Sequence, residues 1–539
     1  MAYDFSSIRY PELVFGIAGP IGIDIDAIST ALTDALHAVD YKTVPIRLTR
    51  EIAEIPSSVK IPVRQDYYSQ IKYKMDHTSQ ICRDNNDPAW AMRFVVDAIR
   101  RERGNLQGLD LVGEEEDQGF APFVDVARED KVCHRVAYIV RQIKRPEEVK
   151  LLRNIYGKQF VLISAFATEE DRINVITEKI KRTLPLTTKQ SKILAFAESL
   201  ALKDASEDAD SHGQHLRDAF HLADVFIDGL SAAPMRSKIE RFVNALFGLN
   251  DISPTKTEFG MYAAKAAALR SADLSRQVGA AIFSADGELI TQGCNEVPKA
   301  FGGTYWDTEE PDFRDVKIGN DPNDILKREV LRDILERLES NKLLSDRAKD
   351  LARSGGQLID VLLKKKGEGD ADGCGCLHGS LISDLTEFGR VVHAEMNAIC
   401  DAARTGRSIK GGILFCTAFP CHNCTKHILA SGVSRVFFLE PYPKSRAKEL
   451  HHNEIELGRS SSTRVTFHPF LGISPFRYRD IFEKGKRKEG GVATKWYYEY
   501  PTPMIDVIVP NYTRLELFAT AKIFGKVDGV EANLKDSVV

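Results

Sequence analysis

Two short segments rich in cysteine and histidine place the strongest constraint on how this chain can fold. The first is His393-Ala394-Glu395, and the second is Pro420-Cys421-His422-Asn423-Cys424. Each segment opens a helical pattern, and Gly412–Thr417 between them has the apolar content of a strand. The side chains of His393, Cys421 and Cys424 can meet at one point if this part of the chain folds as helix, strand and helix.

The three side chains have the chemistry of a catalytic zinc site. A Cys-x-x-Cys pair at a helix start lets two sulfurs converge, and the positive helix end favours thiolates. One histidine and two cysteines leave the fourth tetrahedral position of zinc open to water. Glu395 follows the histidine by two residues and can move protons without ligating the metal. His-x-Glu followed by Pro-Cys-x-x-Cys is typical of zinc-dependent nucleobase deaminases.

Other uses of these cysteines and histidines are weighed against that interpretation. A closed structural zinc site would need a fourth ligand, for which the nearby candidates are Cys400, Cys416, His422 and His427. It would leave Glu395 and Pro420 without a role. Cys374, Cys376 and His378 form either a second metal site or, more in keeping with their glycine-rich surroundings, a loop with incidental thiols.

Composition narrows the class of protein further. The 539 residues are 43% hydrophobic and 28% charged, which is ordinary for a soluble chain of several domains. The net charge of −4 argues against a broad nucleic-acid-coating surface. Nine cysteines, an odd number spread along the chain, do not indicate a secreted disulfide framework. Without a signal-peptide pattern or a membrane-spanning apolar run, a cytoplasmic protein with no membrane partner is expected.

The hydrophobic pattern divides the chain into three parts. Short apolar runs alternate with helical patterns over residues 1–185, which predicts a doubly wound parallel sheet. Residues 186–255 read as a helical connector. Residues 256–539 are expected to form a second α/β domain, which contains the two zinc motifs and is interrupted by an insert at about 310–390.

A glycine-rich segment, Gly16-Ile-Ala-Gly19-Pro-Ile-Gly22-Ile-Asp24, stands at the first strand-to-helix junction. A phosphate-binding loop belongs at such a junction, because backbone N–H groups and the helix end can face an anion there. The lysine and hydroxyl residue of a working Walker A motif are missing, and Asp24 would repel a phosphate. A P-loop fold without hydrolysis is favoured over nucleotide sensing and over phosphoryl transfer. A tight turn alone would also explain Gly19 and Gly22.

Residues 256–470 resemble the cytidine and deoxycytidylate deaminase superfamily, on the two zinc motifs together with Arg276–Ala280 and Gly293–Pro298. The resemblance implies an α/β/α domain with a mixed five-stranded sheet. It assigns a contact with the nucleotide sugar to Asn295, and a hydrogen bond from the backbone N–H of Ala394 to the base carbonyl. The family usually has Tyr-Asn-Gly where this chain has Cys-Asn-Glu, which implies a sugar loop of different shape.

The whole chain resembles the bacterial anti-phage dCTP deaminases, in which a P-loop kinase-like domain precedes the deaminase domain. Further segments that fit are His212–Arg217, Asp218–Asp224 and Glu440–Ser445. The resemblance implies deamination of dCTP to dUTP and of dCMP to dUMP, with depletion of dCTP during phage infection. It also implies a small antitoxin RNA as inhibiting partner, and a homo-oligomer, because related deaminases complete their sites across subunits.

Two other functions remain open at this point. A polynucleotide-editing deaminase would act on tRNA or single-stranded DNA and would need a basic groove with stacking aromatics. The basic runs Lys364–Lys366 and Lys484–Lys488 leave room for it, while the net charge opposes it. A non-catalytic, zinc-stabilised RNA-binding regulator would keep the metal but would not need Glu395 for turnover.

Overall fold

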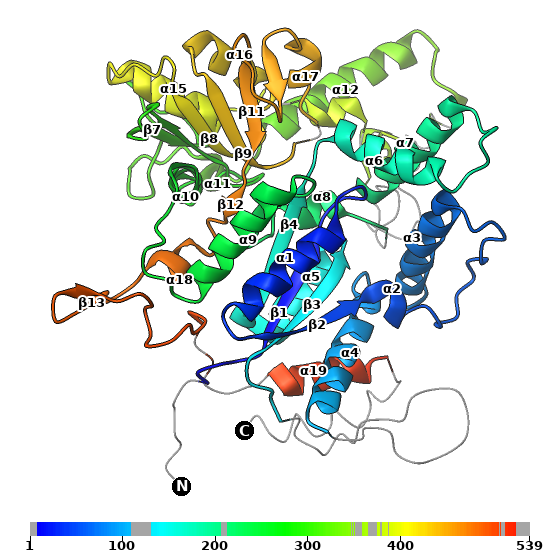
Figure 1. The fold of residues 1–539 in the computed structure, drawn as a ribbon. Helices are drawn as coiled ribbons and strands as arrows, with labels where there is room; N and C mark the ends of the chain where they lie inside the picture. The colour runs from blue at the N-terminus through cyan, green and yellow to red at the C-terminus, as the bar shows by residue number, and fades with distance from the viewer. Residues whose placement is uncertain are drawn as a thin grey trace, which may run out of the picture. The chain divides into compact units, whose positions relative to one another are not determined.

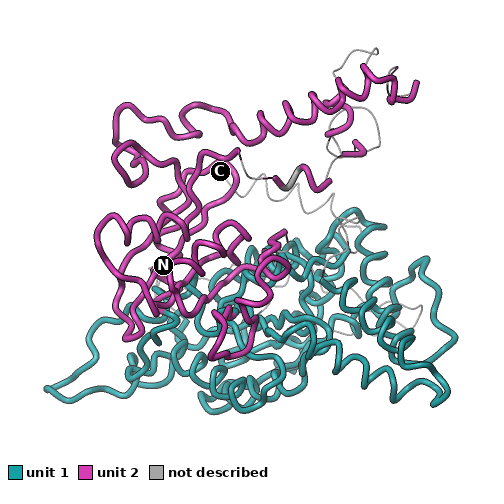
Figure 2. Tube along the Cα trace, turned by 90° about the horizontal axis from the view of Figure 1, so that it is seen from above, with its two compact units in different colours: residues 1–258, 469–539 teal, residues 259–468 magenta. Residues whose placement is uncertain are grey.

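The computed structural model in Figure 1 describes residues 8–108, 131–205, 213–346, 348, 350, 358–364, 375–377, 380–385, 388–442, 444–505, 507 and 512–523. The chain divides into two compact units, which Figure 2 distinguishes by colour. Unit 1 comprises residues 1–258 and 469–539, and unit 2 comprises residues 259–468. Unit 2 is therefore inserted into the sequence of unit 1.

Unit 1 is built on a six-stranded sheet in the order β12-β5-β4-β1-β3-β2. Neighbouring strands from β5 to β2 are parallel, and β12 pairs antiparallel with β5 at the edge. The parallel sheet expected for the first part of the chain is confirmed. Its strands are β1 (Leu13–Ala18), β2 (Lys42–Arg47), β3 (Val136–Ile143), β4 (Phe160–Phe166), β5 (Val225–Asp228) and β12 (Gly472–Ile473).

Helices follow the strands of this sheet, as the alternating pattern predicts. The central strand β1 is buried along its whole length, which is typical of a parallel strand covered on both faces. The helices are α1 (Ile25–His37), α2 (Leu48–Glu51), α3 (Tyr67–Asp84), α4 (Trp90–Leu106), α5 (Pro146–Tyr156), η1 (Gly157–Gln159), α6 (Glu169–Lys181), α7 (Gln190–Ala205), α8 (Leu216–Phe220), α9 (Ala232–Leu246), α18 (Tyr478–Phe482) and α19 (Tyr512–Ala521).

The structure divides the chain differently from the sequence pattern in two places. The expected helical connector, residues 186–255, contributes strand β5, whose four residues are too few to stand out by periodicity. Residues 469–539, expected to belong with the deaminase-type domain, return to unit 1. The guanidinium of Arg477 anchors this returning segment by donating to Asp224 at 3.0 Å and to the carbonyl of Phe160.

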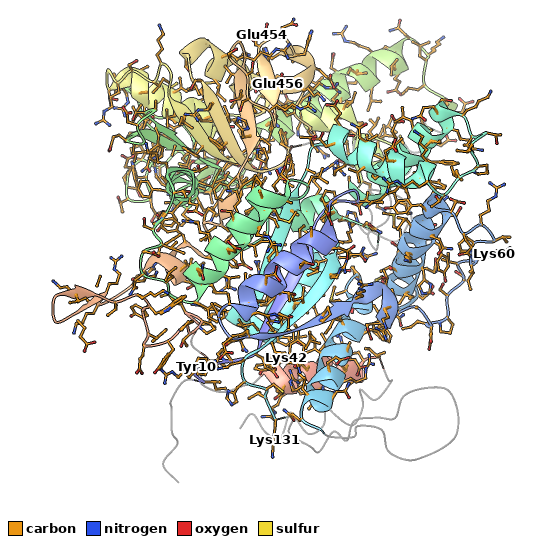
Figure 3. All side chains as sticks on the ribbon, viewed as in Figure 1. Tyr10, Lys42, Lys60, Lys131, Glu454 and Glu456 are labelled. Atoms are coloured by element: carbon orange, nitrogen blue, oxygen red, sulfur yellow. The ribbon has the colours of Figure 1, made fainter. Side chains whose placement is uncertain are left out.

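Unit 2 is built on a mixed six-stranded sheet in the order β10-β11-β9-β8-β6-β7, so the expected five strands were one too few. The additional edge strand β10 is only three residues long, and the charged residues Glu454 and Glu456, which Figure 3 labels, lie at this edge. Charged side chains on a short edge strand discourage pairing with another sheet. The strands are β6 (Gly279–Phe283), β7 (Leu289–Cys294), β8 (Ile413–Ala418), β9 (Arg435–Glu440), β10 (Ile455–Leu457) and β11 (Val465–Pro469).

The helices of unit 2 include those of the insert. They are α10 (Lys256–Ala268, whose first three residues belong to unit 1), α11 (Asp315–Ile318), α12 (Pro322–Ser340), α14 (Leu358–Leu363), η2 (Leu381–Asp384), α15 (Ala394–Arg404), α16 (His422–Ser431) and α17 (Ala447–Leu450). Between Asp315 and Asp384 the named elements are all helical, which agrees with an insert that interrupts the strand pattern. A separate two-stranded hairpin in unit 1 pairs β13 (Lys488–Glu489) with β14 (Val492–Ala493). Within the described residues, no helix has the length and apolar content needed to cross a membrane.

Candidate metal centre

The metal-binding side chains stand at the starts of two helices. His393 is the N-cap residue of α15, and Cys421 is the N-cap residue of α16. The thiol of Cys421 accepts the backbone N–H of Cys424 at 3.4 Å, as a side chain at a helix N-cap commonly does. Strand β8 leads directly into the second of these caps. The predicted helix–strand–helix arrangement is confirmed.

Three ligand atoms converge at this point. Nδ1 of His393 lies 3.4 Å from Sγ of Cys421 and 3.4 Å from Sγ of Cys424. Tetrahedral zinc, with zinc–sulfur bonds of about 2.3 Å and zinc–nitrogen bonds of about 2.0 Å, places such a nitrogen and sulfur about 3.5 Å apart. The side chains therefore already stand at the separation that zinc requires.

The three side chains shift one another's pKa values, and the hydrogen bond with Cys421 raises the pKa of the Cys424 thiol. The pKa of the Cys421 thiol is lowered to about 4, chiefly by its hydrogen bond with Cys424 and also by His393. The pKa of His393 is raised to about 9, first by its hydrogen bond with Cys421. Cys421 is thus held as a thiolate, which is the form that binds metals.

Glu395 lies beside the ligands without joining them. It is 4% exposed, and its Oε2 accepts a hydrogen bond from Sγ of Cys424 at 3.5 Å. Burial raises the pKa of its carboxyl group. A buried carboxyl group beside a metal centre, outside the set of ligands, stands where it could transfer protons.

No fourth protein ligand completes the centre among the described residues, where His393, Cys421 and Cys424 form the only group of this kind. Cys416 is buried and donates to the carbonyl of Phe437 at 3.6 Å, and Cys400 is exposed. His422 and His427 do not join the group either. An open fourth position distinguishes catalytic zinc sites from closed structural ones.

Part of the alternative second metal site, Cys374 and His378, lies outside the described residues, as do Lys365 and Lys366 of one basic run. Cys376, the remaining member of the alternative site, is exposed.

Asn295, the residue expected to contact a sugar, is held by three hydrogen bonds. Its Nδ2 donates to Oδ2 of Asp273 at 2.7 Å and to the carbonyl of Arg276 at 2.8 Å. Its Oδ1 accepts the backbone N–H of Val278 at 2.7 Å. Both amide protons are committed to the protein, so the amide oxygen alone retains capacity for another partner.

Two further residues of the region expected to bind substrate, Ala394 and Glu296, are buried in the structure. Ala394 is fully buried and is the first residue of α15, so its N–H has no acceptor within the helix. Glu296, which stands where the family usually has glycine, is 1% exposed and accepts the backbone N–H of Ala272 at 2.9 Å. This bond ties the loop after α10 to the end of β7, and gives the substituted residue a structural role.

Two residues that the sequence pattern did not single out support the centre. Asp273 holds Asn295, and its negative charge contributes to the raised pKa of His393. Asn397 is buried, and its Nδ2 donates to the carbonyl of Cys294 at 2.9 Å, which connects α15 to β7. The spacing of Asn397, one helical turn after His393, was the signal available in the sequence.

The glycines of the amino-terminal loop are explained by close packing. A Cβ atom on Gly16 would lie 2.4 Å from the side chain of Ile143, and one on Gly19 would lie 2.3 Å from that of Ile23. Gly22 has a φ of +102°, which favours glycine over other residues. These constraints hold whether or not the loop binds a nucleotide.

Comparison with known proteins agrees with the geometry. Residues 254–440 match the family model described as the cytidine and deoxycytidylate deaminase zinc-binding region. The deoxycytidylate deaminase of Enterobacteria phage T2 is 44% identical over 55 residues, which make up 10% of this chain and 29% of that protein. ComE operon protein 2 of Bacillus subtilis (strain 168) is 37% identical over 68 residues, or 13% of this chain and 33% of that protein.

These alignments span a third or less of the length of the two curated relatives. Among solved structures, the dCMP deaminase from the cyanophage S-TIM5, crystallised with dCMP and dUMP, is 19% identical. The alignment covers 40% of this chain and 98% of that chain, with a TM-score of 0.22. The family model and the converging ligands together show that this chain carries a zinc-binding region of the cytidine and deoxycytidylate deaminase type, in which His393, Cys421 and Cys424 hold the metal.

Proposed function

We propose that unit 2 catalyses the hydrolytic deamination of free deoxycytidine nucleotides, converting dCTP to dUTP and dCMP to dUMP. The observation that carries the proposal is the position of Glu395, buried beside three metal ligands yet outside the ligand set. A structural zinc site has no use for such a carboxyl group. The local identity with deoxycytidylate deaminases favours a deoxycytidine nucleotide as substrate.

The residues of the centre divide the reaction between them. When bound, zinc supplies the Lewis acidity that makes water a nucleophile at neutral pH. Glu395 takes one proton from the attacking water and delivers it to the ring nitrogen, and then takes the second proton from the hydroxyl formed at C4 and delivers it to the departing amino group. Water adds at C4 of cytosine, the carbon–nitrogen bond breaks, and the products are uracil nucleotide and ammonia. The N–H of Ala394 holds the base carbonyl, and Oδ1 of Asn295 faces the sugar.

The biological setting belongs to the same proposal and rests on the resemblance of the whole chain to anti-phage dCTP deaminases. In this proposal the cytoplasmic enzyme lowers dCTP during phage infection, acts as a homo-oligomer, and is inhibited by a small antitoxin RNA. Unit 1, a P-loop kinase-like domain in this proposal, would regulate the enzyme. Its strand β1, glycine-rich loop and helix α1 follow one another as in a P-loop motif, which supports that assignment.

The test is incubation of the purified full-length protein with dCTP, dCMP, CTP and a cytosine-containing oligonucleotide, with uracil products quantified. Deamination of dCTP or dCMP is expected. Glu395→Gln should retain zinc and lose at least about a hundredfold in kcat, the usual contribution of a general acid–base. Asp401→Asn, on the same helix, is the matched control and should behave as wild type. Product from the oligonucleotide alone, or unchanged turnover by Glu395→Gln, would overturn the proposal.

A further inference from the structure

In unit 1, the glycine-rich loop after β1 binds the carboxylate of a side chain from the same protein, Asp204. Oδ2 of Asp204, near the end of α7, accepts the backbone N–H of Ile21 at 2.7 Å. Asp204 is completely buried. It comes to the loop from 183 residues further along the chain.

The side chain of Lys144 also contacts Asp204. Nζ of Lys144, which directly follows β3, lies 2.6 Å from Oδ1 of Asp204 and donates to the carbonyl of Gly19 at 2.7 Å. The ammonium group therefore joins the loop to the carboxylate. A backbone N–H and a lysine that converge on one acidic group are the two donors with which strand-to-helix loops hold phosphates.

The glycine-rich loop lies at a position in the sheet where α/β proteins commonly bind ligands. The chain leaves β1 toward β2 on one side and leaves β4 toward β5 on the other, and β1 and β4 are neighbours. The loop after β1 therefore stands at the topological switch point of the sheet, outside the carboxyl ends of its strands. The carboxylate of Asp204 occupies this position, where it accepts the backbone N–H of Ile21.

A second cationic side chain, that of Arg172, lies beside the same loop. Arg172, in the first turns of α6, packs against Gly22, where a Cβ atom would lie 3.0 Å from Cβ of the arginine. Its Nε and Nη1 are buried and have no hydrogen-bond partner among the residues that the structure describes. Burial lowers the pKa of Arg172, while the charges of Asp204 and Glu169 oppose that effect.

Charged groups of both signs lie around the loop. Lys144 and Arg172 are positive, while Asp204 and Glu169 are negative, and Asp24 caps the helix that follows. The charge of Asp204 also adds to the effect of burial in raising the pKa of the Tyr67 phenol. A phosphate has more acceptor oxygens and more charge than a carboxylate, so it could use the donors of Arg172 that Asp204 leaves unmet.

We propose that Asp204 is a built-in competitor for phosphate at this loop. With Asp204 in place the loop excludes phosphate, and a nucleotide or inorganic polyphosphate binds to Ile21, Lys144 and Arg172 when Asp204 withdraws. The end of α7 would then move with the bound ligand. Because α6 and α7 pack together (Figure 1), loss of the Asp204 contact would change the packing of both helices. The proposal concerns unit 1 and does not depend on the activity of unit 2.

The experiment measures binding of inorganic pyrophosphate to the full-length protein by isothermal titration calorimetry. Asp204→Asn, which keeps an acceptor for Ile21 but removes the charge, should bind at least about tenfold tighter than wild type, since one close like charge is lost. Glu198→Gln, an exposed carboxylate on the same helix, is the matched control and should leave the affinity unchanged. Adding Lys144→Gln to Asp204→Asn should abolish the gain. Equal affinity of Asp204→Asn and wild type would overturn the proposal.

A second measurement uses the wild-type protein, so that the outcome does not depend on a variant that folds poorly. Hydrogen–deuterium exchange is followed with and without saturating pyrophosphate. Slower exchange in residues 19–24, together with faster exchange near the end of α7, is expected, because the ligand replaces Asp204. Unchanged exchange in both segments at saturation would contradict the proposal.

Discussion

The carboxylate of Glu258 accepts the backbone N–H of Ile473 at 2.9 Å, across a separation of 215 residues. The same carboxylate accepts the backbone N–H of Thr255 at 2.8 Å and two N–H groups of Arg241, at 2.7 and 2.9 Å. Glu258 is the last residue of unit 1 before the chain enters unit 2, and Ile473 follows its return. One buried side chain therefore fastens both the exit and the return segments to α9.

Glu258→Ala should lower the free energy of unfolding of unit 1 by about 2–4 kcal/mol, because it leaves two backbone N–H groups and Arg241 without their charged acceptor. Denaturant unfolding measures the loss. Glu483→Gln, which removes an exposed carboxylate paired with Arg479, should change the value by less than about 0.5 kcal/mol. Equal effects of the two substitutions would show that Glu258 has no special role.

The metal centre predicts that replacing a ligand cysteine lowers the zinc content of the protein, while replacing a cysteine outside the ligand set does not. Wild-type protein should contain about one zinc per chain, and Cys424→Ser should lose it, because a hydroxyl is a poor replacement for a thiolate ligand. Cys400→Ser, at an exposed position on α15, should retain the metal. Plasma mass spectrometry of the desalted proteins measures the zinc content. Retention of zinc by Cys424→Ser would remove that residue from the ligand set.

Asn295 and Asp273 should be energetically coupled through their 2.7 Å hydrogen bond. Asn295→Asp places a second carboxylate against Asp273 and should destabilise unit 2 by about 1–3 kcal/mol. Adding Asp273→Asn should recover part of that loss, since the new amide can donate where Asn295 did. A double-mutant cycle of unfolding free energies gives the coupling. Strictly additive effects would contradict the predicted pairing.

A buried ionic cluster in unit 1 predicts a pH dependence of stability. Nη1 of Arg103 lies 2.7 Å from Glu516, and its Nη2 lies 2.8 Å from Glu12, all three side chains being almost completely buried. Burial raises the pKa of Glu516. Glu516 therefore binds a proton more tightly in the folded protein than in the unfolded chain, where a glutamate titrates near about pH 4.3, and this contribution to stability declines as the pH rises from there through the folded pKa.

Glu516→Gln should remove that part of the pH dependence, because the amide carries no titrating proton. Urea unfolding at a series of pH values from about 4.5 to 7 measures the slope. Glu489→Gln, at an exposed position in the hairpin, is the control and should keep the wild-type slope. A slope that is the same in Glu516→Gln and wild type would exclude Glu516 as its source.

The metal centre was predictable from the sequence because its ligands are held by local structure. His393 and Cys421 each cap a helix, and Cys424 lies one turn from Cys421, so spacing alone brings the donors together once β8 is in place. The parallel sheet of unit 1 was predictable for a similar reason, since buried parallel strands are continuous apolar runs.

The features that escaped prediction depend on contacts between distant parts of the chain. Gly472 and Ile473 form only a two-residue strand, and their place in the sheet is decided by β5 and Glu258 rather than by their own sequence. Asp204 reads as an ordinary charged residue near the end of a helix, and only the fold reveals its contact with Ile21. Three-residue β10 is below the length at which periodicity indicates a strand.

The return of the chain to unit 1 also sets an order of events during synthesis. The chain runs through all of unit 2 before it reaches β12, so β5 has no neighbour at that edge of the unit 1 sheet until residues 472–473 have been made. An open edge can pair with other chains. Until β12 pairs with β5, the sheet of unit 1 therefore has an edge at which the nascent chain can aggregate.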